Sequence, residues 1–565
     1  MRSPARSTYT YLTLVGVLVV LVFAARGMFA PGDGSGSGSG SAPDDRAHPH
    51  TLPGVTGADG EPSPRLLNDM WARYGHSASC SQWSGADGMQ AIRLNRNKIA
   101  WFFSDTFLGP VNKDGSRPLF GKTMIQNSMV IQTTGSDGRN SLATVTGGGT
   151  CGDAESGGPK ALLPRPEATP RPWYWAAGDA IVGNTLVKFY NRFHYGGPRY
   201  IPEGTVMARF DMSQLTAQSP PKVQRPPTTR IPSYTPVPGG SPILWGASVL
   251  VDGPTTYIYG WETADVNVQD KRLYLARVPS RSLADFGAWS FYAGSGTWTT
   301  AQSDARPLQP VGAKLSVSNG FTVAKLGGRY WLIQHEPDLF DADIVAYPAA
   351  TPWSSFDVSK RIELFHAPEV GPDVAHDFRM IYEARLLPAL STRDRLVIGY
   401  SVNSAGVSAG CRNLVTYTDK IYRPRFITVP RSVFTAGRRP AHASVSYDPR
   451  PVSNAARRFH GPWHNTWSGR ACPRLRRIVY IGARPGKDGS VTLSWPDAGL
   501  DVWYRVSVRD RVGGHWGPYR VVAKTFNPAV TLTGYRRGST HRWKVVPMNV
   551  KNDSGPPITI KQTLP

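Results

Sequence analysis

The sequence has few of the features that mark membrane-spanning, zinc-binding or mainly helical proteins. Beyond one apolar run near the N-terminus, no stretch is long and apolar enough to span a bilayer. It contains no His-Glu-x-x-His motif, and no long amphipathic helical pattern appears. Glycine, proline, tryptophan and tyrosine are all frequent. This composition favours many short strands joined by tight turns, so we expect an all-β chain.

Cysteine is scarce, and the four cysteines do not have the spacing of a zinc site. They are Cys80, Cys151, Cys411 and Cys472. Their even number, in a part of the chain that we expect to be exported, predicts two disulfide bonds, with three connectivities open. Pairing of neighbours is favoured, because each bond would then staple a loop-rich region.

The N-terminal segment resembles an export signal. Two arginines precede an apolar run over about residues 9–25, and a third follows it. Residues 1–30 therefore form either a signal peptide cut after Ala30 or an uncleaved signal anchor. Residues 31–64, rich in Gly, Ser and Pro, are expected to be a flexible tether. We expect the rest of the chain to lie outside the cytoplasm, secreted or tethered to the outer face of the membrane.

Acidic residues are outnumbered, and the formal net charge is +24. Much of the excess is arginine between residues 423 and 477, which overlaps an Arg- and Pro-rich stretch at 431–474 without periodicity. Such a region can contact anionic polymers or a membrane surface. A solvated linker in a protein from an Arg-rich proteome is the simpler interpretation, which we favour for 431–474.

Residues 84–109 have the pattern of a β-hairpin. Two apolar runs flank a polar turn at Asn95–Lys98. The start of the first strand and the end of the second lie at one edge of an antiparallel hairpin, and these positions hold Asp87 and Asp105. Two carboxylates at one edge can supply the acid and base of glycosidic-bond cleavage. Both can equally be turn residues.

The hairpin recurs in degenerate form up to about residue 430. The five copies cover residues 84–109, 178–192, 245–262, 319–336 and 382–403. Further β-like segments follow each copy, and irregular repeats of several strands are typical of propeller blades. We therefore predict a five-bladed β-propeller over residues 65–430.

If each hairpin opens a blade, its polar residues gather at one mouth of the central shaft. The first strands would supply Asp87, Asp179, Ser248, Asn319 and Glu383, and the returning strands Asp105, Arg192, Glu262, His335 and Glu336. Carboxylates brought together push their pKa values apart, which makes one an acid and another a base. We predict Asp87 and Asp105 as the catalytic pair, with Asp179, Glu262, Glu383, His335 and Arg192 binding substrate. Taken singly, several have structural explanations; Glu383, for example, can pair with Arg385.

Aromatic residues are dense around this set. Exposed tryptophan faces stack on sugar rings, although most propeller aromatics fill the space between blades. Trp83 and Trp261 stand next to acidic positions, so we predict them as sugar platforms. The other aromatics, Trp175 among them, are assigned to the core.

From about residue 475 the pattern changes to short alternating strands up to residue 565. This part resembles a fibronectin type III β-sandwich, with Trp495 on its second strand. The tyrosine-corner position holds His541 instead. Such modules are spacers or binding accessories, so no catalysis is assigned to it.

Three further motifs fit poorly. Gly406–Gly410 matches a nucleophile elbow by letter but lacks the helix that should follow it. Gly121–Thr123 lacks the upstream glycine of a P-loop. Asp338, Asp341 and Asp343 could bind calcium, although an acidic surface loop is the simpler interpretation. We expect no cofactor, with calcium the one that stays open.

Four short motifs suggest a family. They are Ala86-Asp87-Gly88, Phe103–Thr106, Trp245–Ala247 and Tyr257–Gly260. Over about residues 66–430 the chain resembles a family of secreted bacterial propeller proteins described as a domain of unknown function. Relatives cleave D-arabinan of actinobacterial cell walls, as endo-D-arabinofuranosidases. The resemblance implies Asp87 and Asp105 as the catalytic pair. This chain has Leu387 where relatives tend to have a His before proline.

The sequence thus favours an exported glycoside hydrolase acting on a cell-wall or environmental polysaccharide. A non-catalytic carbohydrate-binding or adhesion propeller stays open, as does a binder of anionic polymers acting through the Arg-rich linker. We expect a glycan partner, a monomer and no specific nucleic-acid binding.

Overall fold

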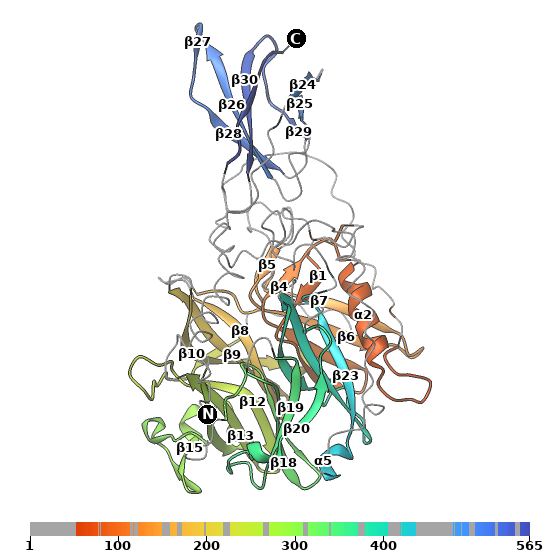
Figure 1. Cartoon of the computed structure of the whole chain (residues 1–565), viewed down its shortest axis with the longest axis vertical. Helices are drawn as coiled ribbons and strands as arrows, with labels where there is room; N and C mark the ends of the chain where they lie inside the picture. The colour runs from red at the N-terminus through yellow and green to blue at the C-terminus, as the bar shows by residue number, and fades with distance from the viewer. Residues whose placement is uncertain are drawn as a thin grey trace, which may run out of the picture.

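The structure is a computed structural model of the chain, shown in Figure 1. The residues it describes are 52, 54–76, 78–79, 81–112, 117, 123–149, 159–166, 172–196, 199–217, 226–263, 270–308, 315–337, 341–370, 379–404, 419, 421–436, 478, 481–486, 489–495, 503–525, 529–548 and 554–564. The predicted signal segment, all four cysteines with their predicted disulfide bonds, and almost all of the Arg-rich linker lie outside these ranges. No helix of the described part is long and apolar enough to cross a membrane.

Between residues 90 and 430 the described part of the chain forms five large antiparallel sheets, coloured from orange to cyan in Figure 1, besides the small sheet that includes residues 106–108 and 123–125. The first contains β2 (Gln90–Asn95), β3 (Lys98–Phe103), β6 (Ser128–Thr134) and β7 (Asn140–Val145). The second contains β8 (Trp173–Val182), β9 (Thr185–Gly196), β10 (Arg199–Asp211) and β11 (Thr228–Arg230). The third contains β12 (Leu244–Asp252), β13 (Thr255–Thr263), β14 (Lys271–Pro279), β15 (Ser290–Gly294) and β16 (Thr297–Thr299). The fourth contains β17 (Thr322–Leu326), β18 (Arg329–His335), β19 (Asp343–Ala349) and β20 (Ile362–His366). The fifth contains β21 (Arg379–Leu386), β22 (Arg395–Ser404) and β23 (Pro424–Pro430).

The first two strands of each sheet are the five hairpins predicted from the sequence. Their turns fall where the turn residues stand: β8 ends one residue before Gly183-Asn184, and β17 and β18 flank Gly327-Gly328. Both glycines of the second pair have positive φ, as tight hairpin turns require. The prediction of an all-β chain is confirmed.

Hydrogen bonds join each of these sheets to the next and the last to the first. The five bonds are Ala176 N to Ser104 Oγ (3.1 Å), Thr205 Oγ1 to Trp245 O (3.3 Å), Val323 N to Ser248 Oγ (2.9 Å), Leu386 N to Thr322 Oγ1 (3.2 Å) and Gly88 N to Ser401 Oγ (3.2 Å). All five involve the first strand of a sheet or the residues just before it. The first strands therefore lie next to one another, and the series of sheets returns on itself.

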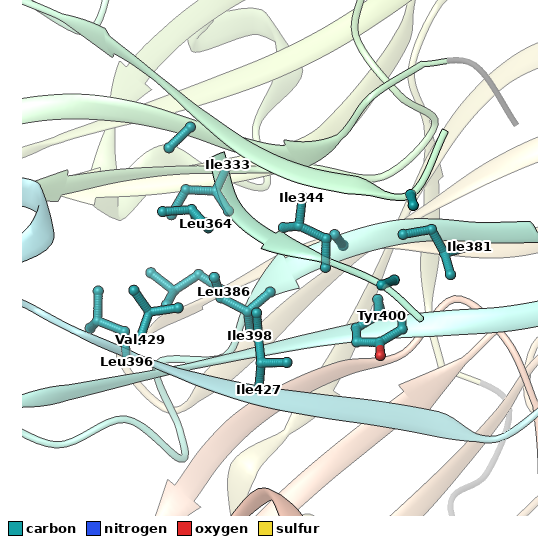
Figure 2. Packing of buried hydrophobic residues seen from close by; sticks show 14 of the residues in the cluster. Ile333, Ile344, Leu364, Ile381, Leu386, Leu396, Ile398, Tyr400, Ile427 and Val429 are labelled. Carbon is teal, nitrogen blue, oxygen red and sulfur yellow. The ribbon is translucent and has the colours of Figure 1, made fainter. Parts of the chain in front are cut away.

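Apolar side chains fill the space between neighbouring sheets. Figure 2 shows the cluster between the fourth and fifth sheets, with Ile333 and Ile344 facing Ile381, Ile398 and other labelled residues. Residues 396–398 of β22 are buried on both faces, which explains their continuous apolar run. Burying an isoleucine such as Ile398 contributes about 1.5–3 kcal/mol, so this packing stabilises the ring of sheets.

Three α-helices of the described residues were not predicted: α2 (Pro64–His76), α3 (Met212–Thr216) and α5 (Val433–Ala436), of which α2 is the longest. Helix α2 starts with proline at its first position, and it buries Leu67, Met70, Trp71 and Tyr74, which have helical spacing. It packs on a small sheet of β1 (Trp83–Ala86), β4 (Thr106–Leu108) and β5 (Thr123–Ile125). The end of the predicted tether is held as well, because Leu52 pairs with Asn140 of β7.

Two more antiparallel sheets, blue in Figure 1, lie in the C-terminal part. One contains β24 (Gly482–Pro485), β25 (Val491–Ser494) and β29 (Ala529–Leu532). The other contains β26 (Trp503–Val512), β27 (His515–Trp516), β28 (Arg520–Thr525), β30 (Thr540–Met548) and β31 (Ile558–Thr563). Their buried side chains form one core that includes Trp495, Tyr504 and Trp543. His541 is buried too, and its Nδ1 lies 2.7 Å from Asp510 Oδ1.

Candidate active site

Asp87 and Asp105 lie side by side where β1 meets β4 and β2 meets β3. Strand pairing aligns Ala86 with Thr106 and Gln90 with Phe102, so the two aspartates face each other between these pairs. The backbone N–H of Asp87 donates to the carbonyl of Asp105 over 3.2 Å, and Ser104 N–H donates to the Asp87 carbonyl over 2.9 Å. The structure therefore brings together the two carboxylates that the sequence predicted at one edge.

Two tyrosines from the fifth sheet and its connections hold the carboxylate of Asp87. Tyr382 and Tyr422 both donate their hydroxyl hydrogens to Asp87 Oδ2, over 2.8 Å and 2.7 Å. Burial raises the pKa of Asp87 well above its usual range, and the charges of Asp105 and Glu383 raise it further, whereas the two tyrosine hydroxyls act in the opposite direction. Asp87 is thus an oriented carboxyl group that retains its proton to unusually high pH.

The second sheet holds Asp105. Trp175 of β8 donates its Nε1–H to Asp105 Oδ1 over 3.0 Å, and the next residue, Ala176, donates its backbone N–H to Ser104. Asp105 is only 1% exposed, whereas Trp175 is half-buried. Asp87 and Asp105 therefore have different donors from different sheets.

Glu383 is the third carboxylate of this group, and its backbone is strained. It has a φ of +54°, in the left-handed region that favours glycine. The pairing of β21 with β22 skips here, between Tyr382 and Arg385. The equivalent skip in β12 is taken up by Gly246, with a φ of +80°. A glutamate stands in the fifth sheet where the third sheet has glycine.

The strained position directs Glu383 towards the aspartates. A Cβ placed on Gly88 would lie 3.0 Å from Glu383 Oε2 and 2.5 Å from Ser104 Oγ, so a glycine is needed beside Asp87. Burial raises the pKa of Glu383, and the charges of Arg385 and Lys188 partly offset this. Its Oε2 is buried and has no hydrogen-bond partner within the described residues. Asp87, Asp105 and Glu383 together are called the carboxylate cluster below.

A buried lysine lies next to the carboxylate cluster. Lys188 of β9 donates to Asp179 Oδ2 over 2.9 Å and also to Gln90 Oε1 and the carbonyl of Ala177. Burial lowers the pKa of Lys188 to about 8, although Asp179 favours its charged form. Asp179, predicted to bind substrate, is therefore the partner of Lys188.

Two other predicted substrate-binding residues lie elsewhere in salt bridges. Glu262 is fully buried and pairs with Arg272 on the neighbouring strand, and it accepts a hydrogen bond from Tyr274 over 3.4 Å. Arg192 pairs with Glu203 over 2.5 Å. Neither has a described contact with the carboxylate cluster, and their assignment as substrate-binding residues stays a prediction.

His335 and Trp261 form a second buried group with Lys271. Trp261 donates its Nε1–H to the Asn319 carbonyl over 3.2 Å, and Lys271 Nζ lies 5.3 Å from the Trp261 ring centroid. Neither ring nitrogen of His335 has a hydrogen-bond partner in the part of the chain that the structure describes. Burial, together with the charge of Lys271, lowers the pKa of His335 to about 3, and burial lowers that of Lys271 to about 8. These three residues are called the basic cluster below.

Neither predicted sugar platform is exposed. Trp83 is fully buried, with its ring 4.7 Å from that of Trp71 of helix α2 and 5.4 Å from that of Phe103. Trp261 is only 4% exposed. Their assignment as platforms was wrong, because helix α2 and the Asn319 segment cover positions that alternation alone left open.

Sequence reasoning missed Trp175, Tyr382, Tyr422 and Lys188. Tyr382 directly precedes Glu383, which the sequence did predict as a site residue, so its position in the sequence could have identified it. Tyr422 and Trp175 stand 335 and 70 residues from the aspartates that they contact, and no local pattern pointed to them.

Two of the three residues considered for calcium are described, and both carboxylates have hydrogen-bond partners within the protein. Asp343 pairs with Arg361 over 2.6 Å and with His366 over 2.8 Å, and Asp341 accepts the backbone N–H of Asp343. Asp338, Gly121–Lys122 and Gly406–Gly410 lie outside the described residues. No group of three or more potential metal ligands occurs within the ranges given above.

Solved structures with related shapes come from several kinds of protein. A candidate hydrolase from Bacteroides ovatus is 20% identical, with a TM-score of 0.49 over 66% of this chain and 92% of its own. A GH43 enzyme from Xanthomonas citri is 13% identical, with a TM-score of 0.32 over 64% of this chain and 92% of its own. A fibronectin type III domain of human collagen α-1(XX) is 19% identical, with a TM-score of 0.15 over 17% of this chain and 92% of its own.

No curated protein sequence matches the chain. A family model does match residues 69–442, which include all five sheets and the carboxylate cluster. The chain belongs to the family described as the domain of unknown function DUF5005.

Proposed function

We propose that this protein is a glycoside hydrolase whose catalytic pair is Asp87 and Asp105. One observation carries the proposal: three carboxyl groups, Asp87, Asp105 and Glu383, interact in one buried place, and each aspartate has its own hydrogen-bond donors. Burying like charges together costs free energy, and such arrangements cluster at active sites. The fold that we propose around this site is a five-bladed β-propeller, followed by a fibronectin type III-like module.

The surroundings suggest a role for each carboxyl group. Asp87, with its strongly raised pKa, is suited to hold a proton and give it to the oxygen of the leaving sugar. Asp105, held by the Trp175 N–H, then acts at the anomeric carbon, as nucleophile or as the base that activates a water. Glu383 keeps the pKa of Asp87 high through its charge.

The substrate we propose is a cell-wall or environmental polysaccharide, with D-arabinan or another furanoside as the first choice. The resemblance at Ala86–Gly88 and Phe103–Thr106 supports it, and so does the half-buried indole of Trp175 beside Asp105. We propose that the N-terminal segment carries the chain out of the cytoplasm, as a secreted or membrane-tethered protein, where such a glycan would be met.

The test is release of oligosaccharides from a panel of wall and plant polysaccharides, D-arabinan included. Asp87→Asn and Asp105→Asn should each lower the rate by about 100-fold or more, because each removes a group that acts in the transition state. The matched control is Asp252→Asn, an aspartate bound by Lys325 and Tyr330 away from the cluster, which should retain full activity. Turnover that survives in both site variants would exclude this catalytic pair.

The alternative is a non-catalytic carbohydrate-binding propeller, and the burial of Asp105 at 1% exposure favours it. In that case the parent protein binds a polysaccharide of the panel without releasing products. The Asp87→Asn and Asp105→Asn variants then alter affinity alone.

A further inference from the structure

Cations and aromatic rings alternate on one face of the C-terminal sheet. The guanidinium carbon (Cζ) of Arg509 on β26 lies 5.2 Å from the ring centroid of Trp516 and 4.7 Å from that of Tyr519. Arg542 of β30 lies 4.8 Å from the Trp516 ring, and Lys544 lies 4.2 Å from the Tyr519 ring. The order is Arg542, Trp516, Arg509, Tyr519, Lys544, and these five residues are called the cationic ladder.

The strand register places like charges directly opposite one another. Arg509 is paired with Arg542, and Arg542 is paired on its other side with Lys561 of β31. Like charges in opposing positions destabilise a sheet. Three adjacent strands nevertheless carry a cation at the same level, which points to a use for the charge.

Nothing in the described part of the chain neutralises the ladder. None of its three cations forms an ion pair there; Asp510, the described aspartate of this module, is bound to His541 and Arg520. From residue 481 to the end the sequence has thirteen Lys and Arg residues, five Asp and no Glu. Stacking on a ring covers the flat face of a guanidinium but leaves its N–H edges able to bind an anion.

We propose that the cationic ladder binds an anionic polysaccharide, one that bears carboxylate or phosphate groups. The rings hold the long side chains of Arg509 and Arg542 in place, so less conformational entropy is lost on binding. Neighbouring strands lie about 4.8 Å apart, so the ladder presents a row of charges that suits an extended polyanion. The choice of a polysaccharide among polyanions rests on the proposed function, since a binding module beside a hydrolase raises the local concentration of its polymer.

A purely structural ladder is the competing explanation. Each contact between a cation and a ring contributes about 0.5–1 kcal/mol at an exposed site, which stabilises the module without any ligand. That explanation predicts that removing two ladder charges lowers stability and leaves binding to any polymer unchanged.

The experiment measures binding of the full chain to polygalacturonate, to poly(glycerol phosphate), to neutral dextran and to duplex DNA over a range of NaCl concentrations. The ladder variant is Arg509→Gln with Arg542→Gln. The control is Arg536→Gln with Arg537→Gln, which removes two exposed arginines from the turn before β30. Both double variants change the net charge equally.

We expect the parent to bind one or both anionic polymers, and the ladder variant to bind at least tenfold more weakly. Its slope of log affinity against log salt should be shallower by about two, because two counterion-displacing contacts are lost. The control should change affinity less than twofold. Tighter binding of polygalacturonate would indicate recognition of carboxylates, and tighter binding of poly(glycerol phosphate) would indicate recognition of phosphates.

Equal losses in both double variants would overturn the proposal, because net charge alone would then explain binding. Equal binding of neutral dextran, or tighter binding of duplex DNA than of either anionic polysaccharide, would overturn it too. If the ladder variant melts at a lower temperature than the parent, the single variant Lys561→Gln provides a second test. Lys561 is paired with Arg542 across the strands but stacks on none of the ladder rings in the described structure, and its loss should also weaken binding. A separate assay of polysaccharide turnover distinguishes this proposal from the proposed hydrolase function. If the parent chain shows no turnover but the ladder variant still loses binding, only the hydrolase function is refuted.

Discussion

The carboxylate cluster and the basic cluster are both buried and titratable, yet they handle their charge in opposite ways. In the first, burial and neighbouring carboxylates raise the pKa values of Asp87 and Glu383, and tyrosine and tryptophan donors orient the two aspartates. In the second, His335 has no described hydrogen-bond partner. Burial lowers the pKa values of His335 and Lys271, which favours the neutral form of each side chain. The carboxylate cluster therefore retains repulsion between like charges, whereas the basic cluster reduces it by favouring uncharged side chains.

This difference indicates which group does chemistry. Retained repulsion and a strained backbone at Glu383 each cost stability, and such costs persist where function requires them. The buried imidazole of His335 also costs stability, because its ring nitrogens have no described hydrogen-bond partner, but its lowered pKa keeps it neutral and so avoids burying a second charge beside Lys271. The sequence predicted His335 and Glu383 as members of one site, but neither ring nitrogen of His335 forms a hydrogen bond to Glu383 in the described structure.

The largest effect that would test the comparison is on turnover. Glu383→Gln should reduce kcat by about tenfold, since the charge of Glu383 adds to burial and to the charge of Asp105 in raising the pKa of Asp87. Glu262→Gln makes the same chemical change in a carboxylate committed to Arg272, so it should lower the melting temperature and leave kcat unchanged. Oligosaccharide release and thermal melting measure both. Equal loss of kcat in the two variants would show that Glu383 of the carboxylate cluster has no greater role in turnover than Glu262, which is paired with Arg272.

The basic cluster should appear in stability at acid pH. The folded pKa of His335 is about 3 and its unfolded value is near 6.5, so between these values the unfolded state binds more protons. Stability should fall as pH drops from 6.5, by up to about 1.4 kcal/mol per pH unit from this residue.

Urea unfolding at pH 7, 6, 5 and 4 measures this loss. The variant His335→Leu should lose less stability on acidification than the parent. His366→Leu is the control, since His366 is exposed, and it should follow the parent. Parallel curves for His335→Leu and the parent would show that this imidazole does not contribute.

The sequence was informative where local chemistry decides the structure. Gly183-Asn184 and Gly327-Gly328 predicted turns because those residues accept the required backbone angles. The pairing of Asp87 with Asp105 followed from hairpin geometry alone.

Contacts between distant segments had no such signal. Alternation along a strand says which residues share a face, but not what covers that face. Trp83 was therefore predicted to be exposed, although Trp71 of helix α2 covers it. Tyr422 reaches Asp87 from 335 residues away, and the strain at Glu383 depends on how β21 pairs with β22.

That strain predicts a smaller effect on stability. Glu383→Gly and Glu383→Gln both remove the charge, but only glycine fits the left-handed backbone without cost. Glu383→Gly should therefore be more stable than Glu383→Gln by about 1 kcal/mol. Chemical denaturation of the pair measures it. At Glu363 of β20, whose φ is not positive, the order should reverse, because glycine in a strand costs about 0.5–1 kcal/mol. The same order at both sites would contradict the strain at Glu383.

The smallest expected effect concerns the tyrosines that set the carboxylate cluster apart from the basic one. Tyr422→Phe removes a hydroxyl that stabilises the ionised form of Asp87, so the pKa of Asp87 should rise. If Asp87 gives its proton to the leaving group, the alkaline limb of kcat/KM moves to higher pH by about half a unit, or about 0.7 kcal/mol. Tyr400→Phe removes a buried hydroxyl bound to Glu369, and should leave the limb in place. A shift to lower pH in Tyr422→Phe would mean that the limb belongs to another group, and that Asp87 acts as a base.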